Sequence, residues 1–173
     1  MLLEEFNSGT RDAALSIAKP ALDIPRWYDA IVDGRPYASV DELTEAAMRV
    51  AAPLAEAEID AALAHHPRIG ERAQGDSAEA AHARSEQAGV DASAADALAA
   101  GNRAYEARFD RVYLVRAAGR SASDILALLE QRLGNTPEQE LEVIDQQLRE
   151  IAALRLAGAV ETPGSEKTEG ARP

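Results

Sequence analysis

The chain has 173 residues, of which 46% are hydrophobic and 4% aromatic, so it is long enough for a single domain with one core. Its abundant Ala and Leu and its few β-branched runs favour helices over strands, which predicts an all-α fold, a compact multi-helix bundle. The formal net charge of −12, with no cluster of Lys and Arg, argues against nucleic acid and anionic membranes as partners, and the lack of Cys excludes disulfides and thiolate chemistry.

The two ends of the sequence bear on where the protein works. Residues 1–14 include acids where a secretory signal needs basic residues, and no apolar run approaches the roughly 18 residues of a membrane span. Residues 170–173 do not form a peroxisomal address. We therefore expect a cytoplasmic protein with no membrane partner.

Prolines are expected to interrupt helices in the first part of the chain. Short helices are expected between the breaks at Pro20, Pro25, Pro36 and Pro53. Ser39, followed three residues later by Glu42, is a capping signature that predicts a helix over 40–52. Another helix is expected over 53–64, with Pro53 in its first turn. It ends before Pro67, because proline disfavours helical geometry in the residue that precedes it.

Helical signals continue through the middle of the chain. A polar loop over 68–77 leads into an expected helix over 77–88, which Gly89 ends. The next expected helix spans 93–109, and one of its faces is formed by Leu98, Asn102, Tyr105 and Phe109. The only strand-like run, 112–115, is short and has no partner strand. It is therefore expected to be an extended, buried connector and a candidate pocket wall.

The last two expected helices have clear start signals at Ser121 and Thr136. The first is closed by Gly134, and the second is the longest helix of the chain. One face of this last helix is formed by Leu141, Ile144, Leu148, Ile151 and Arg155, so an arginine continues an apolar face. Residues 158–173 have little to bury, which predicts a domain over 1–157 followed by a disordered tail.

Three residues of this pattern are candidates for chemistry. His66 stands at a helix end beside a glycine-containing loop, which suits an acid or base near neutral pH, although a surface histidine near a helix dipole is the competing interpretation. Arg155 on an apolar face must meet a carboxylate, backbone carbonyls or an anionic ligand. Arg120, in a loop before a helix, is either a further anion-binding residue or exposed.

A metal site is the alternative use of the same histidine. His82 and Glu86 are four residues apart on one expected helix face, so with His66 they could supply two imidazoles and a carboxylate. Such a spacing arises easily by chance in a Glu-rich chain, and Glu86 can equally be a solvated helix residue. The sequence contains no Walker loop, dinucleotide-binding glycine motif or serine-nucleophile motif.

Five short motifs occur in an order that resembles one family. They are HPRIG at 66–70, SEQAG at 85–89, NRAYE at 102–106 followed by Phe109, GRS at 119–121 and LRL at 154–156. This ordered set, within a resemblance that runs from Phe6 to Leu156, is similar to the 2-oxo-4-hydroxy-4-carboxy-5-ureidoimidazoline (OHCU) decarboxylases. These enzymes form (S)-allantoin and CO₂ in uric acid degradation.

The resemblance implies an all-helical homodimer that needs no metal and no organic cofactor. It assigns His66 as the catalytic acid or base, with Glu86 binding the substrate or orienting it with His66, and with Pro67 shaping the loop that presents His66. Arg155 would hold a substrate anion or anchor the site. The substrate ring would be bound by Gln87 and by the backbone of Tyr113, Leu114, Val115, Arg116 and Ala117, with Arg120 and Asn102 as further candidates.

Two positions depart from the family pattern. Ala83 stands three residues before Glu86, where Ser is common, and Arg116 stands where a small residue is common. Two further interpretations therefore stay open. One is a helical binding or adaptor module that kept the scaffold and lost turnover, and the other is a metal-dependent hydrolase that uses His66, His82 and Glu86.

Overall fold

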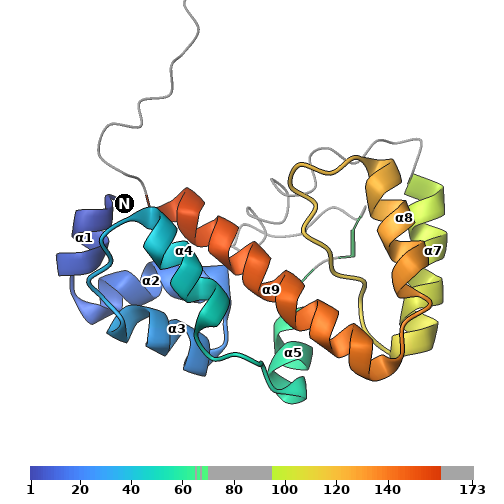
Figure 1. Cartoon of the computed structure of the whole chain (residues 1–173), viewed down its shortest axis with the longest axis horizontal. Coiled ribbons are helices and arrows are strands. Elements are labelled where there is room, and N and C mark those ends of the chain that lie inside the picture. The colour runs from blue at the N-terminus through green and yellow to red at the C-terminus, as the bar shows by residue number, and fades with distance from the viewer. Residues whose placement is uncertain (65, 67, 70–94, 161–173) are drawn as a thin grey trace, which may run out of the picture.

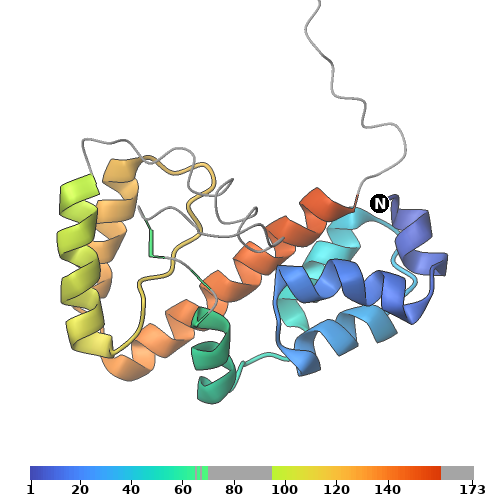
Figure 2. The ribbon, with the colours of Figure 1, turned by 180° about the vertical axis from the view of Figure 1, so that it is seen from behind.

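The structure is a computed structural model that describes residues 1–64, 66, 68–69 and 95–160. All regular elements of this described part are helices, which confirms the predicted all-α fold. They are α1 (Leu3–Ser8), α2 (Arg11–Ala21), α3 (Pro25–Asp33), α4 (Val40–Arg49), α5 (Glu56–Leu63), α7 (Ala95–Phe109), α8 (Ala122–Arg132) and α9 (Pro137–Ala159). Helices α1 to α4 gather at one end, α7 and α8 lie at the other, and α9 runs through both groups (Figures 1 and 2).

Side-chain caps begin three of these helices where the sequence predicts them. Ser39 Oγ accepts a hydrogen bond from the Glu42 backbone N–H at 3.1 Å, and Ser121 caps α8 in the same way. At the start of α9, Thr136 Oγ1 and the side chain of Gln139 each accept from the other's backbone N–H, at 3.2 and 2.9 Å. Each cap satisfies N–H groups that have no partner inside the helix and contributes about 1 kcal/mol.

Other helix ends in the first half differ from the prediction. Pro20 lies in the last turn of α2 instead of separating two helices. Helix α4 ends at Arg49, because the chain turns at Ala51, whose φ is 57°. Helix α5 begins at Glu56 and not at Pro53, because the Glu58 carboxylate accepts from the Ala55 N–H at 2.7 Å and closes the first turn there.

The end of the last helix differs from the expected domain boundary, and a helix expected in the middle of the chain is not described. Helix α9 continues through Gly158 to Ala159, and Val160 is only 1% exposed, so the packed chain extends beyond the boundary expected at residue 157. The helix expected over 77–88 lies outside the described residues. No helix in the described part of the chain has the length and apolarity needed to span a membrane.

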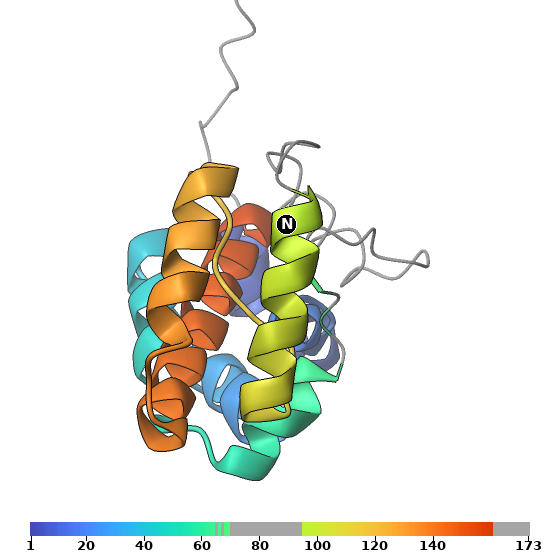
Figure 3. The ribbon, with the colours of Figure 1, turned by 90° about the vertical axis from the view of Figure 1, so that its right-hand side faces the viewer.

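The core consists of two clusters of buried apolar side chains, and α9 contributes to the N-terminal one. The N-terminal cluster contains Trp27 and Leu43 from the first four helices together with Leu148 from α9. The C-terminal cluster is built by α7, α8 and the chain between them, and Figure 3 shows these two helices side by side. Gly101 permits this close packing, because a Cβ there would lie 2.1 Å from Cδ2 of Leu129.

Candidate active site

His66 follows α5 directly and is held by the end of that helix. Its backbone N–H donates to the Leu63 carbonyl at 3.0 Å, and its Nδ1 lies 2.9 Å from the Ala62 carbonyl oxygen. A carbonyl oxygen only accepts, so Nδ1 carries the proton of this bond, and in the neutral ring Nε2 keeps its lone pair. Nε2 is buried. The local fold thus presents a proton-accepting nitrogen inside the protein, as an acid–base role for His66 requires.

Helix α7 fixes the chain on the other side of His66. Asn102 is 3% exposed, and its Nδ2 donates to the Ile69 carbonyl at 3.0 Å. Ile69 itself packs into the C-terminal cluster. The face predicted from Asn102 and its apolar neighbours is buried, and on that face the Asn102 amide bonds to the Ile69 backbone. It ties the segment that carries His66 to α7.

An ion pair adds a second tie between this segment and α7. Arg68 Nη2 lies 2.9 Å from Glu106 Oε2, and the arginine holds the pKa of Glu106 below its ordinary value. A carboxyl whose pKa is lowered by folding adds stability above its unfolded pKa and loses that contribution as the pH falls through its folded pKa. The pair therefore stabilises the fold at neutral pH and not in acid.

Glu106→Gln is expected to lower the free energy of unfolding at pH 7 by less than about 1 kcal/mol, because both side chains are partly solvated. The difference from the unsubstituted protein should disappear as the pH falls below about 4. Urea unfolding across this pH range measures it. Glu142→Gln, at an exposed position of α9, is the matched control. A difference that persists in acid would contradict the ion-pair explanation.

Residues 113–117 form an extended segment between the two core clusters, as predicted for a buried connector. Tyr113 and Val115 pack into the C-terminal cluster, whereas Leu114 packs into the N-terminal cluster, which is the alternation of an extended chain. Burial raises the pKa of Tyr113 to about 12, and its hydroxyl donates to the Ile125 carbonyl at 3.2 Å. This phenol is therefore a packing group and not a proton donor near neutral pH.

The backbone of this segment is held along one edge. The Leu114 carbonyl accepts from Arg132 Nη1 at 2.6 Å, and the Arg116 N–H donates to Gln147 Oε1 at 2.8 Å. Within the described residues, the N–H and C=O of Val115, which lies between them, have no protein partner. In an extended chain the N–H and C=O of this one residue point to the opposite edge, where they suit a planar, polar ring that both donates and accepts hydrogen bonds.

Arg132 belongs to a buried polar network that the sequence did not reveal. Arg132 and Glu140 are 5% and 1% exposed, and Arg132 Nε lies 2.8 Å from Glu140 Oε1. Tyr105 donates its hydroxyl hydrogen bond to the same carboxylate, and Asn135 Nδ2 donates to Oε2 at 2.7 Å. The guanidinium also stacks 4.8 Å from the ring centroid of Tyr113. Every member of the network is buried or partly buried around the loop that joins α8 to α9.

The three arginines among the predicted site residues have different surroundings. Arg155 is 5% exposed and donates from Nη1 to the Ala21 carbonyl at 3.3 Å, which is one of the partners expected for an arginine on an apolar face. The side chain of Arg116 pairs with Glu150, with Nε 3.1 Å from Oε2. Arg116 and Arg120 line a separate open pocket of about 510 Å³ between α4 and α9. The backbone of Arg116 therefore belongs to the predicted pocket wall, whereas its side chain pairs with Glu150 and lines the pocket between α4 and α9.

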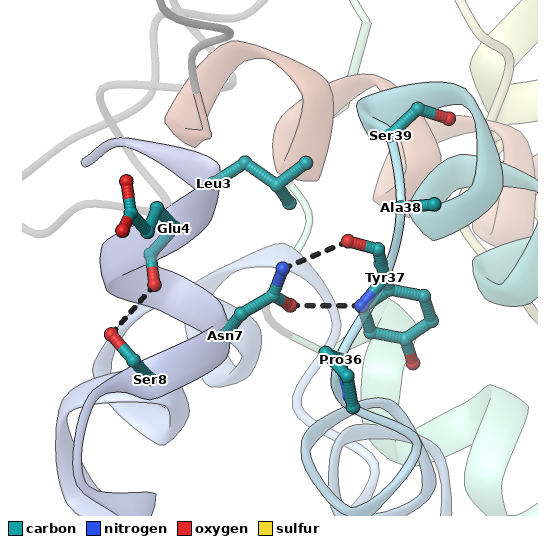
Figure 4. A pocket seen from close by; sticks show the side chains of 8 residues that line it. All are labelled: Leu3, Glu4, Asn7, Ser8, Pro36, Tyr37, Ala38 and Ser39. Atoms are coloured by element: carbon teal, nitrogen blue, oxygen red, sulfur yellow. Dashed lines mark hydrogen bonds between the residues drawn. The ribbon is translucent and has the colours of Figure 1, made fainter.

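A further pocket, of about 450 Å³, lies between α1 and residues 36–39 (Figure 4). None of the predicted site residues lines it. Asn7 lines it, and its side chain accepts from the Tyr37 N–H at 2.9 Å and donates to the Tyr37 carbonyl at 2.8 Å. These two bonds join α1 to the chain before α4.

Three predicted site residues, Pro67, Glu86 and Gln87, lie outside the described residues, as does His82 of the alternative metal site. Among the side chains that the structure describes, no group of three or more potential ligands is placed to bind a metal ion. Asn102 bonds to Ile69, which packs with Tyr113, Val115 and Ala117 in the C-terminal cluster, and His66 stands three residues before Ile69 in the chain.

Comparison with known proteins points to one family. A family model described as OHCU decarboxylase matches residues 7–157. A 2-oxo-4-hydroxy-4-carboxy-5-ureidoimidazoline decarboxylase from Amia calva is 29% identical over 141 residues, which cover 79% of this chain and 81% of that protein. The protein of the same description from Haloferax volcanii is 29% identical over 124 residues, which cover 71% of this chain and 74% of that protein.

Solved structures share the fold. A crystal structure of OHCU decarboxylase in the presence of (S)-allantoin aligns with a TM-score of 0.65 at 22% identity, over 87% of this chain and 97% of that one. A crystal structure of (S)-allantoin synthase aligns with a TM-score of 0.68 at 17% identity, over 92% of this chain and 54% of that one. Because the family model matches nearly the whole helical part of the sequence, the chain belongs to the OHCU decarboxylase family.

Proposed function

We propose that this protein decarboxylates OHCU to (S)-allantoin and CO₂ in uric acid degradation, with His66 moving the proton. The family match over residues 7–157 is the observation that carries the proposal. Breaking the bond to the carboxylate leaves an electron pair that the C=N of the substrate ring can accept. A proton must then reach carbon from one face to give a single enantiomer. The reaction needs orientation and proton transfer, and no external electron acceptor.

The surroundings of His66 support its role in this step. Because Nδ1 donates to the Ala62 carbonyl, Nε2 is the ring nitrogen that can take up and release a proton. Glu86 would orient the substrate with His66, and Pro67 would shape the loop. The N–H and C=O of Val115, together with Gln87, would bind the ureidoimidazoline ring.

Arg155 is proposed to bind a substrate anion. Arg155→Gln is expected to raise KM by about 10- to 100-fold, because a hydrogen bond to a charged group contributes about 1.5–3 kcal/mol. Arg155→Lys should recover only part of this loss, since lysine keeps the charge but lacks the planar fork of donors. Steady-state kinetics measure both. An unchanged KM in a folded Arg155→Gln protein would show that Arg155 does not bind the substrate anion and that its role is structural, as its bond to Ala21 is.

The proposed enzyme is a cytoplasmic homodimer without a metal or organic cofactor. The test starts from urate with urate oxidase and hydroxyisourate hydrolase, and follows allantoin by chiral detection with and without this protein and a chelator. Rapid formation of (S)-allantoin despite the chelator is expected. Racemic allantoin at the spontaneous rate would overturn the proposal and favour a binding module, and loss of activity with the chelator would favour the metal site. Light scattering of the same sample tests the homodimer.

A further inference from the structure

Gln147 is a buried polar residue to which neither the family resemblance nor the sequence pattern assigns a role. It lies on α9, is 8% exposed, and its side-chain amide has a defined orientation. Nε2 is 3.3 Å from Glu150 Oε2, and only the nitrogen of an amide can donate to a carboxylate. Oε1 is thereby left to accept from the Arg116 N–H at 2.8 Å.

The planarity of the peptide bond transmits this contact to Val115. In a trans peptide, the C=O of one residue and the N–H of the next lie in one plane and point in opposite directions. Arg116 N–H shares its peptide with Val115 C=O, so Gln147 directs that carbonyl away from α9. Leu114 C=O likewise shares its peptide with Val115 N–H, and Arg132 holds that carbonyl at 2.6 Å. Two helices therefore fix the directions of both Val115 groups.

We propose that Gln147 is a positioning residue of the decarboxylase, which aims the Val115 carbonyl at the substrate ring. The inference rests on the proposed function and adds to it a residue outside the site motifs. Without an acceptor at position 147, the peptide between Val115 and Arg116 can rotate to find another partner for its N–H. The substrate then meets a misdirected carbonyl. Because the ring is bound in the same way before and during reaction, substrate binding suffers more than turnover.

Three variants test this role. Gln147→Leu keeps the volume and removes the acceptor, and it should raise KM on the order of 10-fold with a smaller change in kcat. The charge-conserving swap Gln147→Glu with Glu150→Gln restores an acceptor for Arg116 N–H and reverses the donor and acceptor of the neighbouring bond. The swap should return KM to within about twofold of the unsubstituted value. Gln146→Leu, one residue away and exposed, removes a 3.0 Å bond to the other oxygen of Glu150 but no bond to the Arg116 N–H, so this matched control should change neither constant.

Hydrogen exchange provides a readout that needs no variant. In the unsubstituted protein the Arg116 amide should exchange more slowly than the Val115 amide, because among the described residues only the Arg116 amide has an acceptor. Saturation with (S)-allantoin should then slow exchange at Val115. Equal exchange at both amides without ligand, or no change at Val115 with it, would overturn the inference even if Gln147→Leu does not fold.

The KM values of the Gln147 variants also test the positioning role. Unchanged KM in folded Gln147→Leu, or a raised KM that the swap does not restore, would overturn the positioning role. Failure of the proposed function itself looks different, because the unsubstituted protein would then produce no (S)-allantoin above the spontaneous rate.

Discussion

Replacing His66 with alanine is expected to lower kcat by about 10²–10⁴-fold, the usual contribution of a positioned acid or base. The buried Nε2 is the atom whose loss matters, because Nδ1 is committed to the Ala62 carbonyl. Helix content should not change, since His66 lies after the end of α5 and outside the core clusters. Single-turnover kinetics and circular dichroism measure the two effects.

His66→Asn separates the chemical role from the structural one. The asparagine amide nitrogen occupies the place of Nδ1 and can still donate to the Ala62 carbonyl, but nothing replaces Nε2. We expect this variant to be as inactive as His66→Ala and to unfold at a higher urea concentration. Activity of His66→Asn above about a tenth of the unsubstituted value would show that Nε2 is not the proton-transfer atom, because a general acid or base normally contributes at least 10²-fold.

Glu140→Leu is expected to cost about 3–5 kcal/mol in the free energy of unfolding, because it leaves the Arg132 guanidinium buried without its counter-charge. It also removes the acceptor of the Tyr105 hydroxyl and the Asn135 amide. Burial already raises the pKa of Tyr105, so this hydroxyl stays a neutral donor in need of a partner. Urea unfolding of the variant measures the loss.

The double variant Arg132→Met with Glu140→Leu distinguishes charge burial from packing. Removing both charges should restore much of the stability lost in the single variant, since an apolar pair of similar size avoids the desolvation cost. Activity should not return with stability, because the Leu114 carbonyl loses the donor that orients its peptide. A double variant with additive losses would contradict the ion-pair explanation. A stable double variant with unchanged KM would show that Arg132 has no influence on the segment 113–117.

This buried network explains why the same residues matter for both stability and the site. Arg132 is buried in the C-terminal half, where it pairs with Glu140, and its Nη1 also donates to the Leu114 carbonyl in the segment 113–117. Helix α9 has a comparable double role. It packs into the N-terminal cluster through Leu148 and carries Gln147 toward the wall. Helix α9 therefore fixes the position of the segment 113–117 relative to the N-terminal cluster.

The sequence alone was sufficient for features that depend on near neighbours. The caps at Ser39, Ser121 and Thr136 join residues three positions apart, and the buried faces of α7 and α9 follow from helical spacing. The extended connector at 112–115 was also predictable, because β-branched and aromatic residues occur there without a partner strand. The ordered motifs were enough to indicate the family.

Tertiary structure decided the contacts that hold the candidate site. Arg132 reaches Leu114 across 18 residues, Gln147 reaches Arg116 across 31, and Asn102 reaches Ile69 across 33. Each joins a side chain to a backbone group, and a backbone group looks the same in every residue of the sequence. Only the packing of α7, α8 and α9 determines which carbonyl or N–H comes within reach, so the site motifs were predictable and their supports were not.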